Sequence, residues 1–426
     1  MSVGRDILND SFLLRDKGYS NANGTLDLAR HRWYFIKEAF SPYLVETAIT
    51  DAGCRPDDWI IDPFCGSGTV PLVASMNGYR AVGIEVNPFL AFLAHTKLLQ
   101  CDPKEVETER SMVVGRAGSG RPSSLETFST FSEAGGARKW LFNQEVLRAF
   151  TGGWDATCEL YEPVRSLFRL ALLGAAMDTC NATRDGKALR YRKGWKELAF
   201  GRQHFLEAFE RCLGVVVADL AGCPNDNRSS IVLGDSRQQL SGVNARFKLG
   251  VTSPPYLNSF DYTDIYRPEL FLGRFITTQK ELRALRFKTV RSHIQAKWQD
   301  PRGHDFGPRY EKSKELINAR ADLLWNKRIP TMIQAYFEDI ADVLRSLYNL
   351  ADAGASLWLI VSTSAYAGVE IPVDLIIADI GAKIGWTPQE VGVLRYLRTS
   401  SQHWQKWEGL KGEKPCLRES VVILKA

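Results

Sequence analysis

Short apolar runs bounded by turn residues alternate with amphipathic stretches in two parts of the chain. The first part predicts strands at residues 59–62 and 81–85, each followed by a helix, at 71–77 and from Pro88 onward. Gly78 is suited to close the first helix, and Pro88 to open the second. Strand, helix, strand and helix within about forty residues indicate a βαβ unit with a parallel sheet.

The same alternation returns near the end of the chain. The pattern predicts strands at 230–233 and 248–252, and then a long helix, a strand, a second helix and two strands, at 331–350, 356–362, 373–384, 390–397 and 420–424. A loop separates the last two strands, so they can pair antiparallel. We therefore expect an α/β fold with a doubly wound, mostly parallel sheet and an antiparallel last strand.

Two long stretches interrupt this alternation, at residues 101–228 and 278–328. Residues 101–228 hold a Gly/Ser/Arg-rich segment at 115–124 and helical patterns at 167–177 and 205–221. The first thirty or so residues are polar and predict a loosely ordered arm. The expected organisation is an arm with the first half of the core, a helical insertion, the second half of the core, a basic insertion and a C-terminal part of the core, at 1–100, 101–228, 229–277, 278–328 and 329–426.

Composition narrows the class of protein. The chain has 426 residues and a net charge of +5, and no run of about eighteen apolar residues, so no membrane span is expected. The N-terminus lacks the apolar segment of a secretory signal, and a cytoplasmic location is expected. The eight cysteines form no Cys-x-x-Cys pair and there are six His, so we expect free thiols and no metal site.

The charge is concentrated in the basic insertion. Residues 278–328 contain 13 Lys and Arg against 6 Asp and Glu, a net charge of +7, with Trp298, Tyr310 and Trp325 between them. Such a stretch can be a solvated face, but next to a catalytic loop it suits contact with nucleic-acid phosphates. A second basic stretch runs from Arg184 to Lys196. Either one could carry sequence recognition.

The first βα turn has the composition of a ligand site. Between strand and helix lie Asp62, Pro63, Phe64, Cys65, Gly66, Ser67, Gly68 and Thr69. Glycines let the backbone approach a ligand, and the helix N-terminus offers free N–H groups. The turn matches neither the dinucleotide pattern nor a P-loop. Glu85, at the end of the next strand, can accept hydrogen bonds from a ribose diol, although NAD sites use an acid there too.

Ser253, Pro254, Pro255 and Tyr256 follow an apolar strand. The two prolines remove amide donors and stiffen the chain, which leaves the carbonyl groups of Ser253 and Pro254 free to face a ligand. Tyr256 supplies a flat aromatic face beside them. Carbonyl acceptors and a stacking ring suit an exocyclic NH₂ group of a base, whereas alone the tetrapeptide could be a polyproline turn.

The combination of motifs resembles the amino-methylating DNA methyltransferases of the Ser-Pro-Pro-Tyr type. Residues 62–69 resemble their cofactor motif, and residues 252–256 look like their catalytic motif. Four further segments are similar to the ribose-binding segment, the segment that reaches the adenine end, the cap over the methionine end and the closing strand, at 83–88, 233–235, 31–42 and 418–422. Here the cofactor motif comes first, whereas many Ser-Pro-Pro-Tyr enzymes have the reverse order.

The resemblance implies a Rossmann-like methyltransferase fold, S-adenosyl-L-methionine as cofactor and double-stranded DNA as partner, with a cognate restriction endonuclease as a possible second partner. A base flipped out of the duplex would receive the methyl group on its amino nitrogen. The implied catalytic residues are Ser253, Pro254, Pro255 and Tyr256. The implied cofactor-binding residues are Asp62, Pro63, Phe64, Gly66, Ser67, Gly68, Thr69, Glu85, Val86, Asn87, Asp235, Ser236, Phe35 and Phe40.

The first serine of the tetrapeptide favours cytosine N4 over adenine N6 as the target. Methylation of carbon 5 would need a Pro-Cys loop, and the Pro415-Cys416 pair lies near the final strand, so this cysteine and Cys65 are interpreted as structural. The alternatives are a tRNA guanine-N2 methyltransferase, an inactive methyltransferase-like DNA-binding subunit and an NAD enzyme. The expected role is the modification enzyme of a restriction–modification or phage-defence system.

Overall fold

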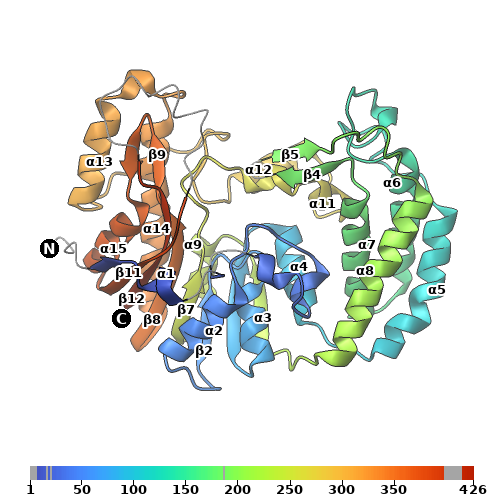
Figure 1. Cartoon of the computed structure of the whole chain (residues 1–426), viewed down its shortest axis with the longest axis horizontal. Coiled ribbons are helices and arrows are strands. Elements are labelled where there is room, and N and C mark those ends of the chain that lie inside the picture. Colours follow the sequence, from blue (N-terminus) through green and yellow to red (C-terminus); the bar gives the residue numbers. More distant parts are fainter. Residues whose placement is uncertain (1–6, 16–17, 20–21, 186–187, 398–414) are drawn as a thin grey trace.

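A central sheet of eight strands organises the protein (Figure 1). The computed structural model describes residues 7–15, 18–19, 22–185, 188–397 and 415–426. In sheet order the strands are β1, β11, β12, β8, β7, β2, β3 and β6, with bounds Leu8–Asn9, Thr387–Tyr396, Arg418–Lys425, Ala351–Ser362, Phe247–Thr252, Trp59–Asp62, Arg80–Glu85 and Ser229–Leu233. β12 is antiparallel to both of its neighbours, and the other pairings are parallel.

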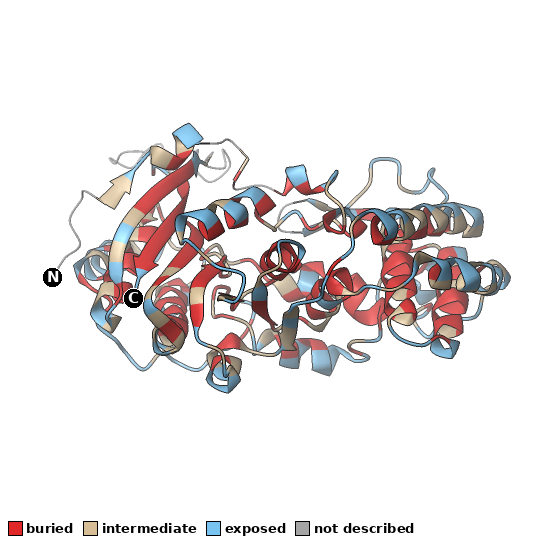
Figure 2. Cartoon of the chain, turned by 90° about the horizontal axis from the view of Figure 1, so that it is seen from below, coloured by how far each residue is buried: buried red, intermediate tan, exposed pale blue. Residues whose placement is uncertain are grey.

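Helices cover both faces of this sheet, because alternate strand residues point to opposite sides. On one face, Ile60 and its equivalents pack under the helices α1, α2 and α3, at Ser11–Arg15, Pro42–Asp51 and Thr69–Met76. On the other face, Ile61 and its equivalents pack under α14 and α15, at Ile329–Leu350 and Val373–Ile384. Figure 2 shows the buried strands between partly exposed helices. The α/β, doubly wound prediction with an antiparallel last strand is confirmed.

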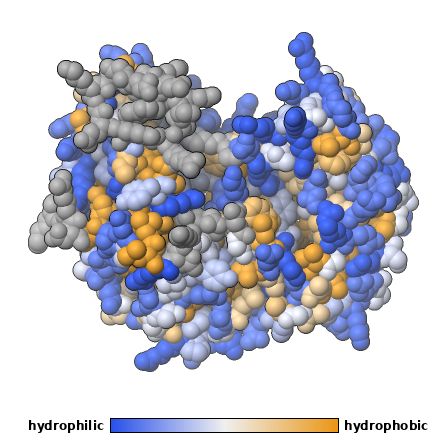
Figure 3. All heavy atoms as spheres, viewed as in Figure 1, coloured by the Kyte–Doolittle hydropathy of each residue, from blue (hydrophilic) through white to orange (hydrophobic). Residues whose placement is uncertain are grey.

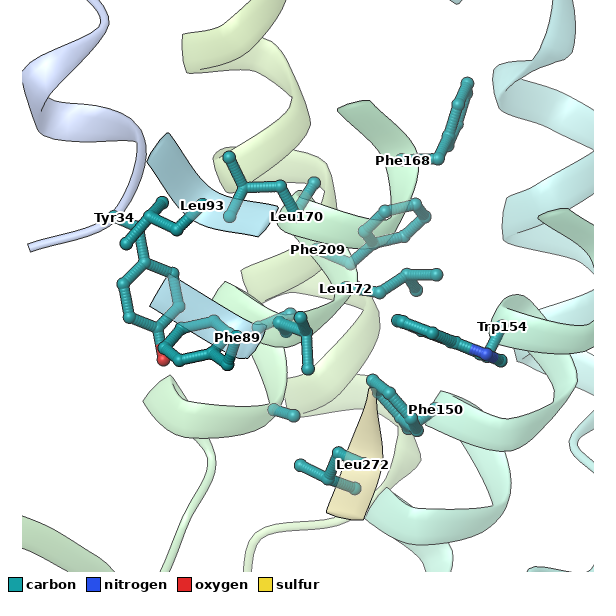
Figure 4. Close-up of a cluster of buried hydrophobic side chains, with 14 of the residues drawn as sticks. Tyr34, Phe89, Leu93, Phe150, Trp154, Phe168, Leu170, Leu172, Phe209 and Leu272 are labelled. Atoms are coloured by element: carbon teal, nitrogen blue, oxygen red, sulfur yellow. The ribbon is translucent and has the colours of Figure 1, made fainter. Parts of the chain in front are cut away.

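A second lobe of helices lies beside the sheet at its β6 end (Figure 1). It consists of α5, α6, α7 and α8, at Pro103–Ser119, Gln144–Ala156, Val164–Asp178 and Arg202–Gly222. These helices share one apolar core with α4 (Pro88–Leu98), to which α4 contributes Phe89 and Leu93 (Figure 4). The predicted helical insertion therefore packs against the first half of the core, through α4. Its first two helices, α5 and α6, lie outside the helical patterns expected from the sequence, and α5 extends into the Gly/Ser/Arg-rich segment as far as Ser119.

Short elements connect the two lobes above the sheet. The hairpin of β4 and β5 (Ala182–Asp185 and Ala188–Tyr191) lies beside α10, α11 and α12, at Tyr262–Ile265, Arg267–Leu272 and Gln279–Arg286 (Figure 1). On the far side, α13 (Pro308–Asn318) packs against the β9–β10 hairpin of Ser364–Tyr366 and Val369–Ile371. The remaining elements are the short helix α9 (Ser236–Gln239) and 3₁₀ turns at Asn23–Thr25, His31–Trp33, Glu133–Gly135, Thr157–Glu159, Leu240–Gly242 and Ala321–Leu323.

The prediction of a loosely ordered N-terminal arm is wrong for residues 7–15. β1 pairs parallel with β11, and α1 lies on the sheet. The reason is Phe12, which is fully buried and meets Trp358 edge-on at 5.6 Å between ring centroids. Gly392 on β11 leaves the space that the Phe12 ring fills. Residues 1–6, 16–17 and 20–21 of the expected arm lie outside the described residues.

No helix in the described ranges is both long enough and apolar enough to cross a membrane. The same ranges contain no group of three or more His, Cys, Asp or Glu side chains that could hold a metal ion.

Replacing Phe12 by Ala is expected to lower the free energy of unfolding by about 3 kcal/mol, since it empties a fully buried aromatic site. Leu14→Ala is the matched control, because Leu14 is on the same helix but is 88% exposed. Urea unfolding followed by circular dichroism measures both. Equal midpoints for the two variants would contradict the packing role of Phe12.

Candidate functional site

A cavity of about 350 Å³ opens at the carboxyl ends of the central parallel strands. The loops after β2, β3, β6 and β7 all reach it, as expected for a doubly wound sheet. The cavity brings together almost all of the residues expected in the site. Its lining includes Phe40, Pro63, Phe64, Gly66, Ser67, Thr69, Glu85, Val86, Asn87, Asp235, Ser236, Ser253, Pro254, Pro255 and Tyr256. Three expected residues, Asp62, Gly68 and Phe35, are not part of the lining.

Asp62 lies outside the cavity lining and supports the Gly-rich turn through hydrogen bonds. Its Oδ1 accepts from the hydroxyl of Thr252 at 2.7 Å and from the amide of Phe64 at 3.0 Å. Burial raises the pKa of Asp62 to about 7, against the effect of these two hydrogen bonds. The carboxyl group thus joins the end of β2 to the end of β7 and fixes where the turn begins.

Glu85 holds the turn from the adjacent strand. One carboxylate oxygen accepts from the Gly66 amide and the other from the Asn87 amide, both at 2.8 Å. Burial raises the pKa of Glu85 to about 7, although these backbone donors favour the charged form. Each carboxylate oxygen has a second acceptor position, so the group can also receive ligand hydroxyls in the cavity.

Gly66 and Gly68 have the conformations that the turn requires. Their φ angles are +50° and +82°, in the left-handed region that favours glycine. A Cβ on Gly68 would lie 2.8 Å from the Cβ of Ala94 on α4, so this glycine permits close packing of two helices. Gly66 has open space around the same position, toward the cavity. The two glycines therefore serve helix packing and ligand approach respectively.

Tyr256 is fixed by two residues of the C-terminal strands. Its hydroxyl donates to Oε1 of Glu419 at 2.6 Å, and Oε2 of Glu419 accepts from Nε of Arg395 at 2.8 Å. Burial raises the pKa of Tyr256 well above its ordinary value, and the Glu419 carboxylate adds to this effect. The phenol is therefore neutral, and its ring is held by its far end. Within the described part of the chain, no hydrogen bond reaches the carbonyl oxygens of Ser253 or Pro254.

Asp235 has an ionic partner that the sequence did not indicate. Arg237 binds both of its oxygens, with the closest contact at 2.6 Å, and also pairs with Asp339 on α14 at 2.9 Å. A ligand donor at this end of the cavity would share the Asp235 carboxylate with Arg237. Ser236 donates its hydroxyl to the carbonyl of Pro63, which ties this loop to the Gly-rich turn.

The segment before α2 contributes to the opposite end. Phe40 is buried and lines the cavity together with Glu38, whereas Phe35 is half-buried outside it. Glu38 accepts from the hydroxyl of Tyr266 at 3.0 Å, and Tyr266 lines the cavity as well. Tyr34 turns away and packs edge-on against Phe89 at 5.3 Å in the core of the helical lobe (Figure 4).

Sequence reasoning missed several cavity residues. Glu419 was missed because its segment, 418–422, was noted only as the closing strand of the sheet. Arg395 was missed because its predicted strand, 390–397, contains no motif. The other missed residues belong to the basic insertion. Its segment after α12 forms one wall of the cavity through Lys288, Thr289, Val290, Ser292 and His293. The one sequence signal for this wall was the presence of small polar residues and a histidine, such as Ser292 and His293, within a basic stretch.

Several basic residues of the 278–328 insertion hold it to the rest of the protein, so they are not all available on its surface. Four of its arginines form ion pairs with acidic side chains elsewhere in the protein: Arg286 with Asp261, Arg291 with Glu338 and Asp339, Arg302 with Glu338 and Asp342, and Arg309 with Asp379. Tyr310 is a core residue against Phe337, not a surface ring, whereas Trp325 is 60% exposed. The exposed cations of the insertion without an ion pair among the described residues are Lys280, Arg283, Lys288, Lys297, Lys312, Lys327 and Arg328.

The second basic stretch has a half-buried end and an exposed end. Arg184 is half-buried and pairs with the fully buried Glu269. Beyond residues 186–187, which lie outside the described residues, Arg190, Lys193 and Lys196 are exposed. Trp195 packs edge-on against Trp140 at 4.7 Å, with Lys196 above its ring. In the space-filling view, hydrophilic side chains border the notch between the two lobes on the helical side (Figure 3).

The cysteines do not supply a nucleophile to the cavity. Cys65 lines it, but burial raises the pKa of its thiol well above the ordinary value, so the thiolate is disfavoured. Cys416 lies exposed two residues before β12 and outside the cavity lining.

The sequence is similar to known methyltransferases. A family model described as DNA methylase matches residues 7–94, which include the Gly-rich turn and Glu85. A Type II methyltransferase of Geobacillus stearothermophilus, M.BsoBI, is 25% identical over 92% of this chain and 85% of its own length. The Type II methyltransferase M.AvaI of Nostoc sp. is 24% identical over 91% of this chain and 85% of its own length.

A shorter similarity is to a methyltransferase of another kind. A tRNA (guanine(10)-N2)-dimethyltransferase of Methanothermobacter thermautotrophicus is 30% identical over 83 residues, which are 19% of this chain and 25% of that protein. The Type II methyltransferases therefore match the chain along most of its length, and the tRNA enzyme matches only a fifth of it.

Proposed function

Since the chain belongs to the amino-methylating family of S-adenosylmethionine-dependent methyltransferases, we propose that it methylates the exocyclic amino group of a cytosine in double-stranded DNA. The observation that carries the proposal is the meeting of Gly66, Glu85 and the Ser253–Tyr256 tetrapeptide in one cavity. The full-length similarity to two Type II methyltransferases supports DNA rather than tRNA as the substrate.

The cavity fits the cofactor and a base together. Glu85 has free acceptor positions for ribose hydroxyls, Gly66 leaves open space for backbone approach, and Phe40 offers an apolar wall at the end nearest Glu38. When bound, S-adenosylmethionine supplies an electrophilic methyl group. The residues of the tetrapeptide then have to bring the amino nitrogen of the base in line with that group.

The tetrapeptide orients the base. The carbonyl oxygens of Ser253 and Pro254 accept the amino N–H groups, which directs the nitrogen lone pair toward the methyl group. Tyr256 stacks on the base, and Glu419 and Arg395 hold its ring in place. The base must leave the helix to enter the cavity, because an amino group in a stacked pair cannot reach the cofactor.

Exposed cations are suited to hold the DNA backbone on both sides of the cavity. The insertion presents Lys288 and Lys297, and the stretch after β5 presents Lys193 and Lys196. Phosphate contacts of this kind give salt-dependent affinity and no base specificity. We therefore assign both basic stretches to the DNA-contact surface.

The Ser at the first position of the tetrapeptide favours cytosine N4, and adenine N6 is the alternative within the same mechanism. A role as the modification enzyme of a restriction–modification system, with a cognate endonuclease, is proposed from the similarity to Type II methyltransferases. An inactive DNA-binding subunit is disfavoured by the intact cavity.

The direct test is incubation of the purified chain with methyl-labelled S-adenosylmethionine and either duplex DNA or tRNA, followed by nucleoside analysis. The expected product is N4-methylcytosine in DNA. N6-methyladenine would overturn the choice of base, label in tRNA alone would overturn the choice of DNA, and no label in either would favour the inactive subunit.

Tyr256→Ala is expected to lower kcat/KM for DNA by about one to two orders of magnitude, the worth of one base–aromatic stack. Tyr256→Phe keeps the ring and loses only the bond to Glu419, so a loss of about fivefold to tenfold is expected. Steady-state methylation assays measure both. A Phe variant as impaired as the Ala variant would contradict the stacking role.

The affinity for S-adenosylmethionine is expected to depend on pH through Glu85. Only the ionised carboxylate accepts fully from the ribose hydroxyls, and its pKa is about 7, so the affinity at pH 6 should be about tenfold weaker than at pH 8. Without ligand the sign is opposite. The unfolded group titrates near 4.5, so this group's contribution to stability falls as pH rises from there to about 7.

Calorimetric titration at several pH values measures the affinity. Glu85→Gln should bind more weakly at pH 8 and lose the pH dependence. Asp62→Asn is the control, since Asp62 is an equally buried carboxyl outside the cavity lining, and it should keep the dependence. An unchanged slope in Glu85→Gln would assign the titration to another group.

A further inference from the structure

His293 of the basic insertion lies in the wall of the cavity without a role in the chemistry described above. The side chain is 1% exposed and lines the same cavity as Ser253 and Tyr256. Trp298 packs edge-on against its ring at 5.1 Å between centroids and donates its indole N–H to the His293 carbonyl at 2.8 Å. The imidazole is therefore held in one place by its own segment.

The hydrogen bonds around the ring select its tautomer. Nε2 lies 3.4 Å from Oγ1 of Thr289, and that hydroxyl already donates its single proton to the carbonyl of Arg286 at 2.8 Å. Oγ1 can therefore only accept from His293, so Nε2 carries the proton of the neutral ring. The lone pair is then on Nδ1, which has no hydrogen-bond partner among the described residues.

Burial keeps this ring neutral. It lowers the pKa of His293 below the ordinary value, and the Arg286 guanidinium acts in the same direction, while the Asp261 charge and a polar contact with the Gln295 side chain oppose it. A buried acceptor without a donor is unfavourable by about 1–3 kcal/mol, so its presence in a ligand cavity indicates that a ligand supplies the donor.

The position of His293 is set relative to the catalytic loop. The Ser259 amide donates to the Ser292 carbonyl at 3.0 Å, and Arg286 pairs with Asp261 at 2.5 Å. Both contacts join the insertion to the residues that follow the tetrapeptide. Any movement of this loop therefore carries His293 with it.

The target base has one kind of donor to offer. In DNA, where a glycosidic bond occupies one ring nitrogen, cytosine and adenine have N–H groups only on the exocyclic amino nitrogen. Glu419, the carboxylate beside the tetrapeptide, already accepts hydrogen bonds from Tyr256 and Arg395. The nitrogen that receives a methyl group must also release a proton.

We propose that Nδ1 of His293 shares one N–H of the target amino group with a carbonyl oxygen of the tetrapeptide and takes its proton during methyl transfer. The nitrogen–methyl bond forms as the methyl–sulfur bond breaks, and that electron pair stays on sulfur. The N–H electron pair stays on nitrogen as the proton moves to Nδ1. The resulting imidazolium then loses a proton to water. The inference rests on the proposed amino-methylation.

Single-turnover methylation of a duplex carrying the mapped target, at saturating S-adenosylmethionine and with enzyme in excess, tests this step. His293→Ala is expected to be about a hundredfold slower than the wild type, and added imidazole should restore part of its rate. His293→Gln keeps an acceptor oxygen but cannot hold the proton, so it should remain slow. Affinities for cofactor and duplex should stay within about twofold of the wild type in both variants.

His304→Ala is the matched control. His304 belongs to the same insertion, but it pairs with Glu338 at 3.2 Å and is not part of the cavity lining, so its rate should equal that of the wild type. A wild-type rate in His293→Ala, full activity in His293→Gln or absence of imidazole rescue would overturn the inference while the proposed function stands. A wild type that methylates no DNA would overturn both.

Discussion

Two buried carboxyl groups hold the ends of three parallel strands together, and the cavity depends on them. Asp62 joins β2 to β7 through Thr252, and Glu85 joins β3 to the Gly-rich turn through Gly66. The tetrapeptide begins directly after Thr252, so the pairing of β2 with β7 and this hydrogen bond together set the distance between the Gly-rich turn and the tetrapeptide. The raised pKa of each group shows that burial opposes the charge, which backbone and hydroxyl donors partly offset.

Around this fixed centre, the insertions supply what the sheet does not. The helical lobe shares its apolar core with α4, so the helix that follows the Glu85 loop is supported from outside the sheet. The basic insertion is bound by arginine ion pairs to acidic residues on α14 and by a backbone hydrogen bond to Ser259, just after the tetrapeptide. Its charge thus does two things, fixing a wall of the cavity with arginines and leaving lysines exposed.

The sheet could be predicted from the sequence because its signals are local. Strands at 59–62 and 81–85 and the helix at 373–384 were expected within a residue of where they lie. The motif residues were expected for the same reason, because each follows an apolar strand. Phe12, Glu419 and His293 could not be expected, since their surroundings come from contacts distant in the sequence. Phe12, for example, is ordered by Gly392 and Trp358.

The place of β12 in the sheet has a consequence for how the protein is made. This strand lies between β8 and β11, yet it follows both of them in the chain. While a ribosome is synthesising the protein, β8 and β11 are complete before the strand that separates them has emerged. The facing edges of β8 and β11 then remain unpaired until β12 is synthesised, and unpaired strand edges can pair with wrong partners. Because β12 also carries Glu419, the arrival of one strand closes the sheet and completes the support of Tyr256 together.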